Sequence, residues 1–82
     1  MSYYVYMILC EDESFYTGYT RDVDERMKLH FRGKGARYTR MHKPQKLVYV
    51  EQFTSRSEAM KRERTVKTMG RRQKLELISS TK

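Results

Sequence analysis

An uninterrupted run of eight apolar and aromatic residues, Tyr3–Cys10, constrains the fold of this chain most strongly. The run is too short for a typical helix and is rich in residues that favour strands, so it predicts a strand buried on both faces. A polar turn at 11–14 and a second strand-forming segment at 15–20 follow it. So short a connection predicts an antiparallel hairpin. A strand that needs cover on both faces belongs in the centre of a sheet, with the third strand at its other edge.

Helix signals begin after the hairpin. Asp22, with a glutamate three residues later, predicts an N-cap, and Gly33 predicts the end of the helix. Between them, Val23, Met27 and Phe31 recur at helical spacing. These three residues predict the apolar stripe by which the helix packs on the sheet.

The remaining segments complete an α+β pattern. The stretch 33–46 contains two glycines and the single proline, and it predicts a loop long enough to be functional. A third strand is predicted over 47–53, a second helix over 55–69 and a third over 71–78, with 79–82 frayed. The order β-β-α-β-α-α predicts a small three-stranded, mainly antiparallel sheet flanked by helices.

Size and composition limit the class of protein. A length of 82 residues predicts one domain, 1–82, with its folded core at about 3–78. The single cysteine, Cys10, excludes an intramolecular disulfide and a cysteine-rich zinc site, and it suits a reducing compartment. No apolar run approaches the ~20 residues that span a bilayer. We therefore expect a cytoplasmic protein that is not a membrane protein.

Positive charge is concentrated in one part of the chain. The formal net charge is +8, and all eighteen lysines and arginines lie from Arg21 onward. Between Arg32 and Lys46 there are six bases and no acid. A field of one sign attracts polyanions, and nucleic acid is the usual partner. The alternative is a solvated surface that only maintains solubility, but the aromatic Tyr38 within this stretch favours nucleic acid.

Two tyrosines on the predicted hairpin are candidates for a site. Tyr6 and Tyr16 lie on its two arms, so they can be close in space. Gly18 follows on the same face as Tyr16, where the missing Cβ would let a ligand approach. The structural alternative is that strands favour tyrosine and that Gly18 marks a bulge.

Three charged or titratable side chains on the predicted helices add to these candidates. Arg26 and His30 share a face at the margin of the first helix, and Glu63 lies just off the apolar stripe of the second. Each has a structural alternative, since an arginine can snorkel, a histidine can sit at a boundary, and Glu63 can pair with Lys67. In a basic domain, a carboxylate at the core margin can also hold Mg²⁺ against a phosphate.

Taken together, the two tyrosine motifs followed by an arginine, a histidine and a glutamate resemble the signature of the GIY-YIG nucleases. The residues that carry the resemblance are Tyr4-Val5-Tyr6, Tyr16-Thr17-Gly18, Arg26, His30 and Glu63. The chain is similar to the small stand-alone prokaryotic members over roughly residues 3–78. It departs from them in lacking the glycine of the first motif and the asparagine that many members carry near the C-terminal end of the domain.

The resemblance implies a role for each matched residue. One of Tyr6 and Tyr16 acts as, or positions, the general base for water. Arg26 stabilises negative charge on the phosphate, and His30 matches a histidine one helical turn later. Glu63 matches the single ligand of a Mg²⁺ ion, which Mn²⁺ can replace.

The implied activity is metal-dependent hydrolysis of DNA phosphodiester bonds, directed by DNA structure more than by sequence, in repair or recombination. A binding module without useful activity, acting with a protein partner that supplies specificity, is the alternative. Both readings predict contacts to nucleic acid from a further set of residues. This set is Arg21, Lys34, Arg37, Tyr38, Arg40 and Lys67.

Overall fold

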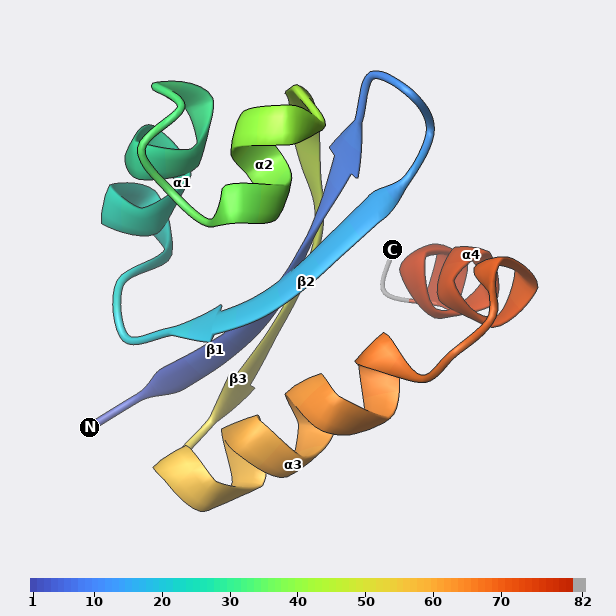
Figure 1. Cartoon of the computed structure of the whole chain (residues 1–82). Helices are drawn as coiled ribbons and strands as arrows, with labels where there is room; N and C mark the ends of the chain where they lie inside the picture. The colour runs from blue at the N-terminus through green and yellow to red at the C-terminus, as the bar shows by residue number, and fades with distance from the viewer. Residues whose placement is uncertain (81–82) are drawn as a thin grey trace.

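The computed structural model describes residues 1–80 and has a three-stranded sheet between two pairs of helices (Figure 1). The elements in chain order are β1 (Tyr3–Cys10), β2 (Phe15–Thr20), α1 (Val23–Phe31), α2 (Arg37–Met41), β3 (Pro44–Phe53), α3 (Arg56–Lys67) and α4 (Arg71–Ser80). Helices α1 and α2 cover one face of the sheet, and α3 and α4 cover the other. The α+β class and the predicted order are confirmed, with one short helix added. No helix within this part of the chain is long and apolar enough to cross a membrane.

The predicted sheet topology is also confirmed. The strand order is β2-β1-β3, and both pairs are antiparallel. Because side chains alternate along a strand, β1 supplies both layers of the core. Val5 and Met7 pack towards α3 and α4, whereas Tyr6, Ile8 and Cys10 pack towards α1 and α2, and all five are buried.

Helix α1 begins and ends where its capping residues predict. The Asp22 side chain accepts a hydrogen bond from the Glu25 amide at 3.1 Å. Gly33 has φ 74°, and its amide donates to the His30 carbonyl at 3.1 Å, while the next amide donates to the Leu29 carbonyl at 2.8 Å. This pair of bonds is the Schellman motif, in which a left-handed glycine closes the helix.

The predicted apolar stripe of α1 is wrong at one position. Phe31 is 48% exposed, whereas His30 is completely buried and Met27 is partly buried. The residues that face the sheet are Val23, Met27 and His30, which follow the helical spacing i, i+4, i+7. Phe31 comes directly after His30, so its side chain projects to one side of that face. The expectation that His30 lies at the margin of the helix is therefore also wrong.

The predicted loop over 33–46 is largely structured. Residues 37–41 form α2, and β3 begins at Pro44 instead of at position 47. Helix α2 has five residues and no side-chain cap at Ala36, so it is too short to show apolar periodicity. A proline is compatible with the first residue of an edge strand, which is where Pro44 lies.

The two C-terminal helices differ from prediction only at their ends. Ser55 caps α3 by accepting from the Glu58 amide at 3.2 Å, as predicted, and the helix ends at Lys67 instead of at position 69. Helix α4 continues to Ser80, so the predicted fraying of residues 79 and 80 is wrong. Positions 81 and 82 lie outside the described residues.

Candidate active site

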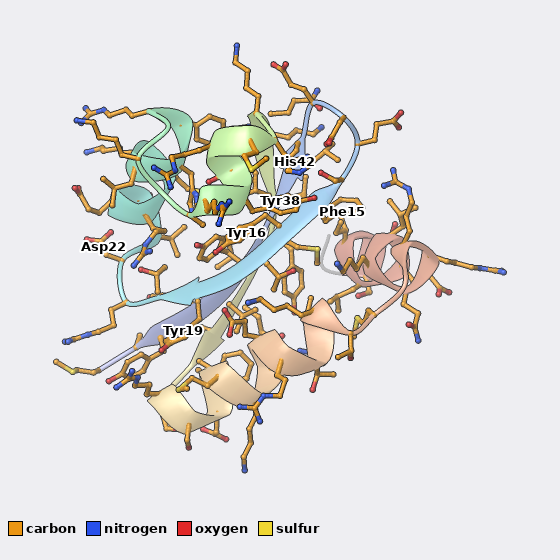
Figure 2. All side chains as sticks on the ribbon, in the orientation of Figure 1. Phe15, Tyr16, Tyr19, Asp22, Tyr38 and His42 are labelled. Carbon is orange, nitrogen blue, oxygen red and sulfur yellow. The ribbon has the colours of Figure 1, made fainter. Side chains whose placement is uncertain are left out.

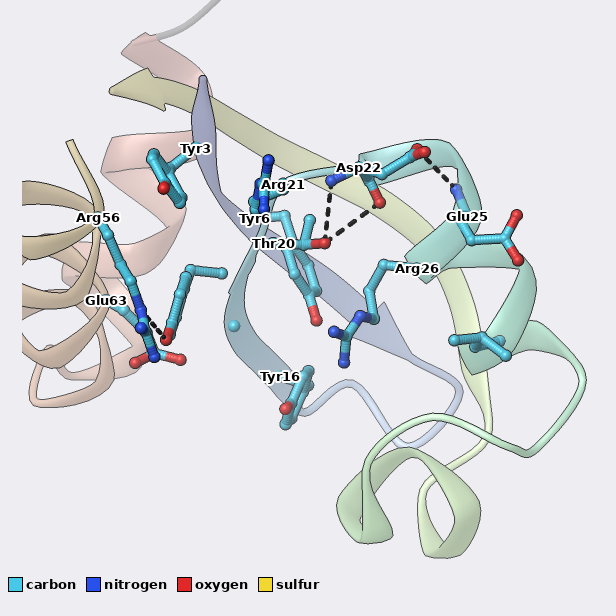
Figure 3. Close-up of a pocket in the computed structure, with 13 residues that line it drawn as sticks. Tyr3, Tyr6, Tyr16, Thr20, Arg21, Asp22, Glu25, Arg26, Arg56 and Glu63 are labelled. Carbon is cyan, nitrogen blue, oxygen red and sulfur yellow. Dashed lines mark hydrogen bonds between the residues drawn. The ribbon is translucent and has the colours of Figure 1, made fainter. Parts of the chain in front are cut away.

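A cleft of about 640 Å³ lies beside edge strand β2 and brings together four of the five predicted catalytic residues. Tyr6 comes from β1, Tyr16 from β2, Arg26 from α1 and Glu63 from α3 (Figure 3). The other residues that line it are Tyr3, Gly18, Tyr19, Thr20, Arg21, Asp22, Glu25, Leu29 and Arg56. Residues up to 60 positions apart in the chain, from 3 to 63, therefore meet at one site.

Position 18 must be glycine because Tyr6 and Tyr16 leave no space for a side chain there. It pairs with Tyr6 across the β1–β2 ladder, and a Cβ at this position would lie 2.6 Å from the Tyr6 hydroxyl oxygen and 3.2 Å from the Tyr16 ring. The ladder continues through Gly18 without a bulge. The glycine thus makes room for the Tyr6 phenol, and the bulge that the sequence allowed is absent, while Gly18 also lines the cleft.

His30 lies behind Tyr6 and does not line the cleft. Its Nε2 is 2.8 Å from the Tyr6 hydroxyl, and its Nδ1 is 2.7 Å from Thr39 Oγ1. The Thr39 hydroxyl donates to the Ala36 carbonyl at 3.0 Å, so it has only lone pairs left for His30. The proton of the imidazole therefore lies on Nδ1, and Nε2 accepts a hydrogen bond from the Tyr6 hydroxyl.

Burial determines the protonation of this pair. Desolvation lowers the pKa of His30 below its usual 6.5, and the positive charge of Arg26 lowers it further, so the imidazole is neutral at pH 7. Desolvation, followed by the proximity of Tyr16, raises the pKa of the Tyr6 phenol well above 10. Tyr6 is therefore un-ionised, with a neutral proton acceptor directly behind it.

Thr39 and Gly35 complete this network and were missed from the sequence. Thr39 is buried on the five-residue helix α2, which the sequence did not predict. A Cβ on Gly35 would lie 2.3 Å from His30 Nδ1, so only glycine fits against the imidazole. The sequence does contain a signal for Gly35. Gly33 alone is enough to end α1, so the second glycine of Gly33-Lys34-Gly35 needs another explanation.

Arg26 and Glu63 place opposite charges on the two sides of the cleft. In Figure 3, Arg26 extends from α1 and Glu63 from α3, with the tyrosine rings between them. Arg26 is exposed and has no ion pair among residues 1–80. The Glu63 side chain is 19% exposed and lies 3.5 Å from the Lys67 ammonium group. The predicted pair with Lys67 exists, yet it leaves the carboxylate in the cleft.

The donor set fits a magnesium ion that retains most of its water. No group of three or more histidine, cysteine, aspartate or glutamate side chains that could hold a metal ion occurs within the described residues. Mg²⁺ in phosphoryl-transfer enzymes usually takes one or two carboxylates, several waters and a substrate phosphate. The partly buried carboxylate of Glu63, open to the cleft, suits this arrangement.

Two of the predicted nucleic-acid contacts, Arg21 and Tyr38, lie at the site. Arg21 lines the cleft. The Tyr38 ring stacks on Tyr16 with centroids 5.8 Å apart and on His42 at 4.1 Å, so an aromatic row leads outward from the tyrosine pair (Figure 2). Asp12 accepts from His42 at 2.6 Å and holds the outer end of the row.

The other predicted contacts lie outside the cleft. Lys34, Arg37 and Arg40 are exposed on α2, which also carries Tyr38, and on the segment before it. Lys67 lies beside Glu63 on α3. Basic side chains therefore occur on both sides of the site.

Comparison with known proteins decides the family. The sequence-family model of the GIY-YIG catalytic domain matches residues 2–76. The chain belongs to the GIY-YIG family. This match covers most of the chain, including the cleft residues contributed by both faces of the sheet.

Sequence relatives and solved structures agree with this assignment. The chain is 53% identical over 76 residues to a UPF0213 protein of Staphylococcus haemolyticus, covering 93% of each chain. It is similar to the NMR structure of a UPF0213 protein from Bacillus halodurans, with a TM-score of 0.62, 52% identity and coverage of 96% of this chain and 84% of the other. A second NMR structure, from E. faecalis, has a TM-score of 0.67 and 38% identity, with 99% and 86% covered.

Membership in the family has general consequences for this GIY-YIG protein. The family consists of nucleases, which act on nucleic acid and generally depend on a divalent metal ion. The UPF0213 relatives are likewise small proteins built around this one domain.

Proposed function

We propose that this protein hydrolyses DNA phosphodiester bonds in a reaction that depends on Mg²⁺, with Mn²⁺ as a substitute. The observation that carries the proposal is the cleft in which two tyrosines, an arginine and a carboxylate meet. Phosphodiester hydrolysis needs a base for water, positive charge where the transition state gathers negative charge, and a Lewis acid. The residues that line this cleft are suited to all three needs.

The proton of the attacking water passes through Tyr6. A tyrosine with a raised pKa is a poor base alone, but Tyr6 already donates a hydrogen bond to the neutral His30. As the water oxygen attacks phosphorus, its proton moves to the Tyr6 oxygen and the phenolic proton moves to His30 Nε2. The bond from phosphorus to the leaving oxygen breaks, and that oxygen takes a proton from solvent water, which gives one phosphate monoester and one hydroxyl. His30 later returns its proton through Tyr6 to solvent.

The other cleft residues act on charge and position. Arg26 lies free of ion pairs within the described chain and stabilises the phosphoryl oxygens. Tyr16 packs against Tyr6 with centroids 6.3 Å apart and keeps the phenol in place. When bound, Mg²⁺ supplies Lewis acidity towards the phosphate, and Glu63 is the protein ligand that would hold it.

The same charges support a preference for DNA structure over sequence. Arg21 and Arg26 are suited to phosphate contacts, which position a strand without reading its bases. Lys34, Arg37, Arg40 and Lys67 add phosphate contacts outside the cleft, and Tyr38 adds an aromatic surface. We assign the activity to DNA repair or recombination in the bacterial cytoplasm, where the substrate and the metal ion are both present.

A cleavage assay with a matched pair of variants tests the proposal. Wild-type protein, Glu63→Gln and the control Glu76→Gln are incubated with labelled single-stranded, duplex and branched DNA, in Mg²⁺, Mn²⁺ or EDTA. Glu76 is an exposed carboxylate on α4, and it does not line the cleft. We expect wild type and Glu76→Gln to cut equally with metal, and Glu63→Gln to lose cutting by at least about 10³-fold.

Two results would contradict the proposal. Equal cutting by Glu63→Gln and wild type would remove Glu63 from the mechanism. Salt-sensitive binding by all three proteins, without cutting of any substrate in either metal, would favour a binding module that acts with a partner protein.

A further inference from the structure

A third arginine, besides Arg21 and Arg26, lines the cleft from the α3 side. Arg56 is the first residue of α3, and its Nε donates a hydrogen bond to the Tyr19 hydroxyl at 3.3 Å. Tyr19 lies on β2, so this bond joins the start of the helix to the strand that carries Tyr16 and Gly18. Arg56 and Tyr19 both line the cleft, and Figure 3 shows Arg56 on the side of the site that Glu63 occupies.

The position of Arg56 relative to Glu63 follows from helix geometry. The two residues are seven positions apart on α3, which is close to two helical turns, so they project from the same face. That face meets the cleft, with Arg26 extending from α1 on the opposite side. A strand that presents one phosphate to Glu63 and Arg26 would therefore run past Arg56.

The charge of Arg56 is available to an anion. Two other arginines of α3 and α4 are paired, since Arg62 lies 2.9 Å from Glu51 and Arg71 lies 3.8 Å from Glu13. Within residues 1–80, Arg56 has no carboxylate partner, and Tyr19 is the residue to which it donates.

The bond to Tyr19 also orients the guanidinium group. Nε donates to the phenol oxygen, which leaves the two terminal nitrogens for a ligand. These nitrogens form a planar fork that matches two oxygens of a phosphate. Tyr19 thus restrains the long side chain at the point where it faces the cleft.

We propose that Arg56 binds a phosphate next to the scissile one on the same DNA strand, and that Tyr19 positions its guanidinium group. The inference rests on the proposed nuclease function and adds a binding position to it. It also assigns a use to Tyr19, which lies directly after the second tyrosine motif. A solvated arginine that merely covers the phenol is the structural alternative.

Steady-state cleavage of a labelled single-stranded DNA oligonucleotide tests the inference with four variants. Arg56→Ala removes the fork, Arg56→Lys keeps the charge but loses the Nε bond, and Tyr19→Phe removes the hydroxyl alone. Arg64→Ala is the control, because Arg64 is an exposed arginine of the same helix that does not line the cleft. Circular dichroism checks that each variant is folded.

We expect KM to rise about tenfold in Arg56→Ala with kcat within about threefold of wild type, since the lost contact binds ground state and transition state alike. Arg56→Lys and Tyr19→Phe should give smaller increases in KM, and Arg64→Ala almost none.

The affinity for DNA is also measured, with each variant made in the Glu63→Gln protein. A purely structural role of Arg56 would leave the salt dependence of this affinity unchanged. The slope of log Kd against log salt concentration should decrease by about 0.7 in Arg56→Ala, the value for one lost phosphate contact on a single strand. It should be unchanged in Arg64→Ala.

Failure of the inference and failure of the proposed function give different results. If wild type cuts and Glu63→Gln does not, the function stands. Equal KM and equal salt slope for Arg56→Ala and Arg64→Ala would then overturn the role of Arg56 alone. A normal KM for Tyr19→Phe, with a raised KM for Arg56→Ala, would overturn the role of Tyr19.

Discussion

The two faces of the sheet are built from different chemistry. On the α3 and α4 side, buried aliphatic and aromatic residues such as Val5, Met7 and Val66 form an apolar layer. On the α1 and α2 side, the corresponding layer contains a buried chain of polar groups that runs from Tyr6 through His30 to Thr39. Apolar burial stabilises a small domain, whereas a buried polar chain is costly unless every member is bonded. The apolar face therefore serves mainly stability, although α3 also supplies Glu63 and Arg56 to the cleft, and the polar face holds the proton path through Tyr6 and His30.

The largest effect is expected from removing one hydroxyl on the polar face. Tyr6→Phe should lower kcat about 10³-fold, because it breaks the path by which a proton reaches His30. Tyr49→Phe is the matched control, since Tyr49 is a buried tyrosine of the apolar layer whose hydroxyl bonds to Glu51. Single-turnover cleavage and thermal unfolding should show a small loss of stability in both variants and a loss of activity in Tyr6→Phe only.

The converse effect is expected on the apolar face. Met7→Ala leaves a cavity at a completely buried position and should lower the free energy of unfolding by about 3 kcal/mol. In a domain of this size, that loss corresponds to a fall in Tm of about 12–24 °C. The value of kcat, measured well below the new Tm, should stay within about threefold of wild type. A large fall in kcat at full folding would show that the two faces are not separate in function.

A methyl group at Gly35 should damage both properties together. Its Cβ would lie 2.3 Å from His30 Nδ1, so the imidazole must move away from Tyr6 or Thr39. We expect Gly35→Ala to cost about 2 kcal/mol of stability and to lower kcat along with it. Gly70→Ala is the control, because nothing lies within 4 Å of a Cβ there. Equal behaviour of the two variants in urea unfolding would contradict the close packing of His30.

The buried imidazole predicts a pH dependence of stability. Because the pKa of His30 is lower in the folded protein than in the unfolded chain, the unfolded chain binds the proton first as pH falls below 6.5. Stability is therefore complete above pH 6.5 and decreases towards the folded pKa, by at most about 1.4 kcal/mol per pH unit. Urea unfolding between pH 7 and pH 5 should show this slope in wild type. In His30→Gln the slope should be reduced.

The smallest effect concerns an exception within the apolar layer. Thr17 is buried, and its hydroxyl has no hydrogen-bond partner within residues 1–80. Thr17→Val replaces the hydroxyl with a methyl group of similar size and should stabilise the protein by about 1 kcal/mol without a change in cleavage. Thr65→Val, at an exposed position of α3, should give no such gain in the same thermal unfolding experiment.

The strands and most helix ends on both faces were largely predictable from sequence, and the buried polar contacts were predictable only in part. The central strand, the caps Asp22 and Ser55 and the end of α1 at Gly33 follow from local patterns, because capping and strand burial depend on residues close in sequence. The two tyrosines were found as motif residues. The burial of His30 behind Tyr6 was not predictable. It depends on α2, which is too short to leave a periodic signal in the sequence.

Close packing accounts for the other differences. Gly18 and Gly35 are required by a Tyr6 phenol and a His30 ring that are distant in sequence. Arg56 resembles any exposed arginine at the start of a helix until the fold brings it to Tyr19. Local sequence patterns carry no information about such contacts.

A double-mutant cycle tests the central claim most directly. Single-turnover rates are measured for wild type, Tyr6→Phe, His30→Gln and the double variant on one labelled DNA oligonucleotide with saturating Mg²⁺. If Tyr6 passes its proton to His30, the double variant should be about as slow as Tyr6→Phe alone, because the two residues act as one unit. Losses that multiply in the double variant would contradict the proton path and would leave His30 as a residue that only supports the fold.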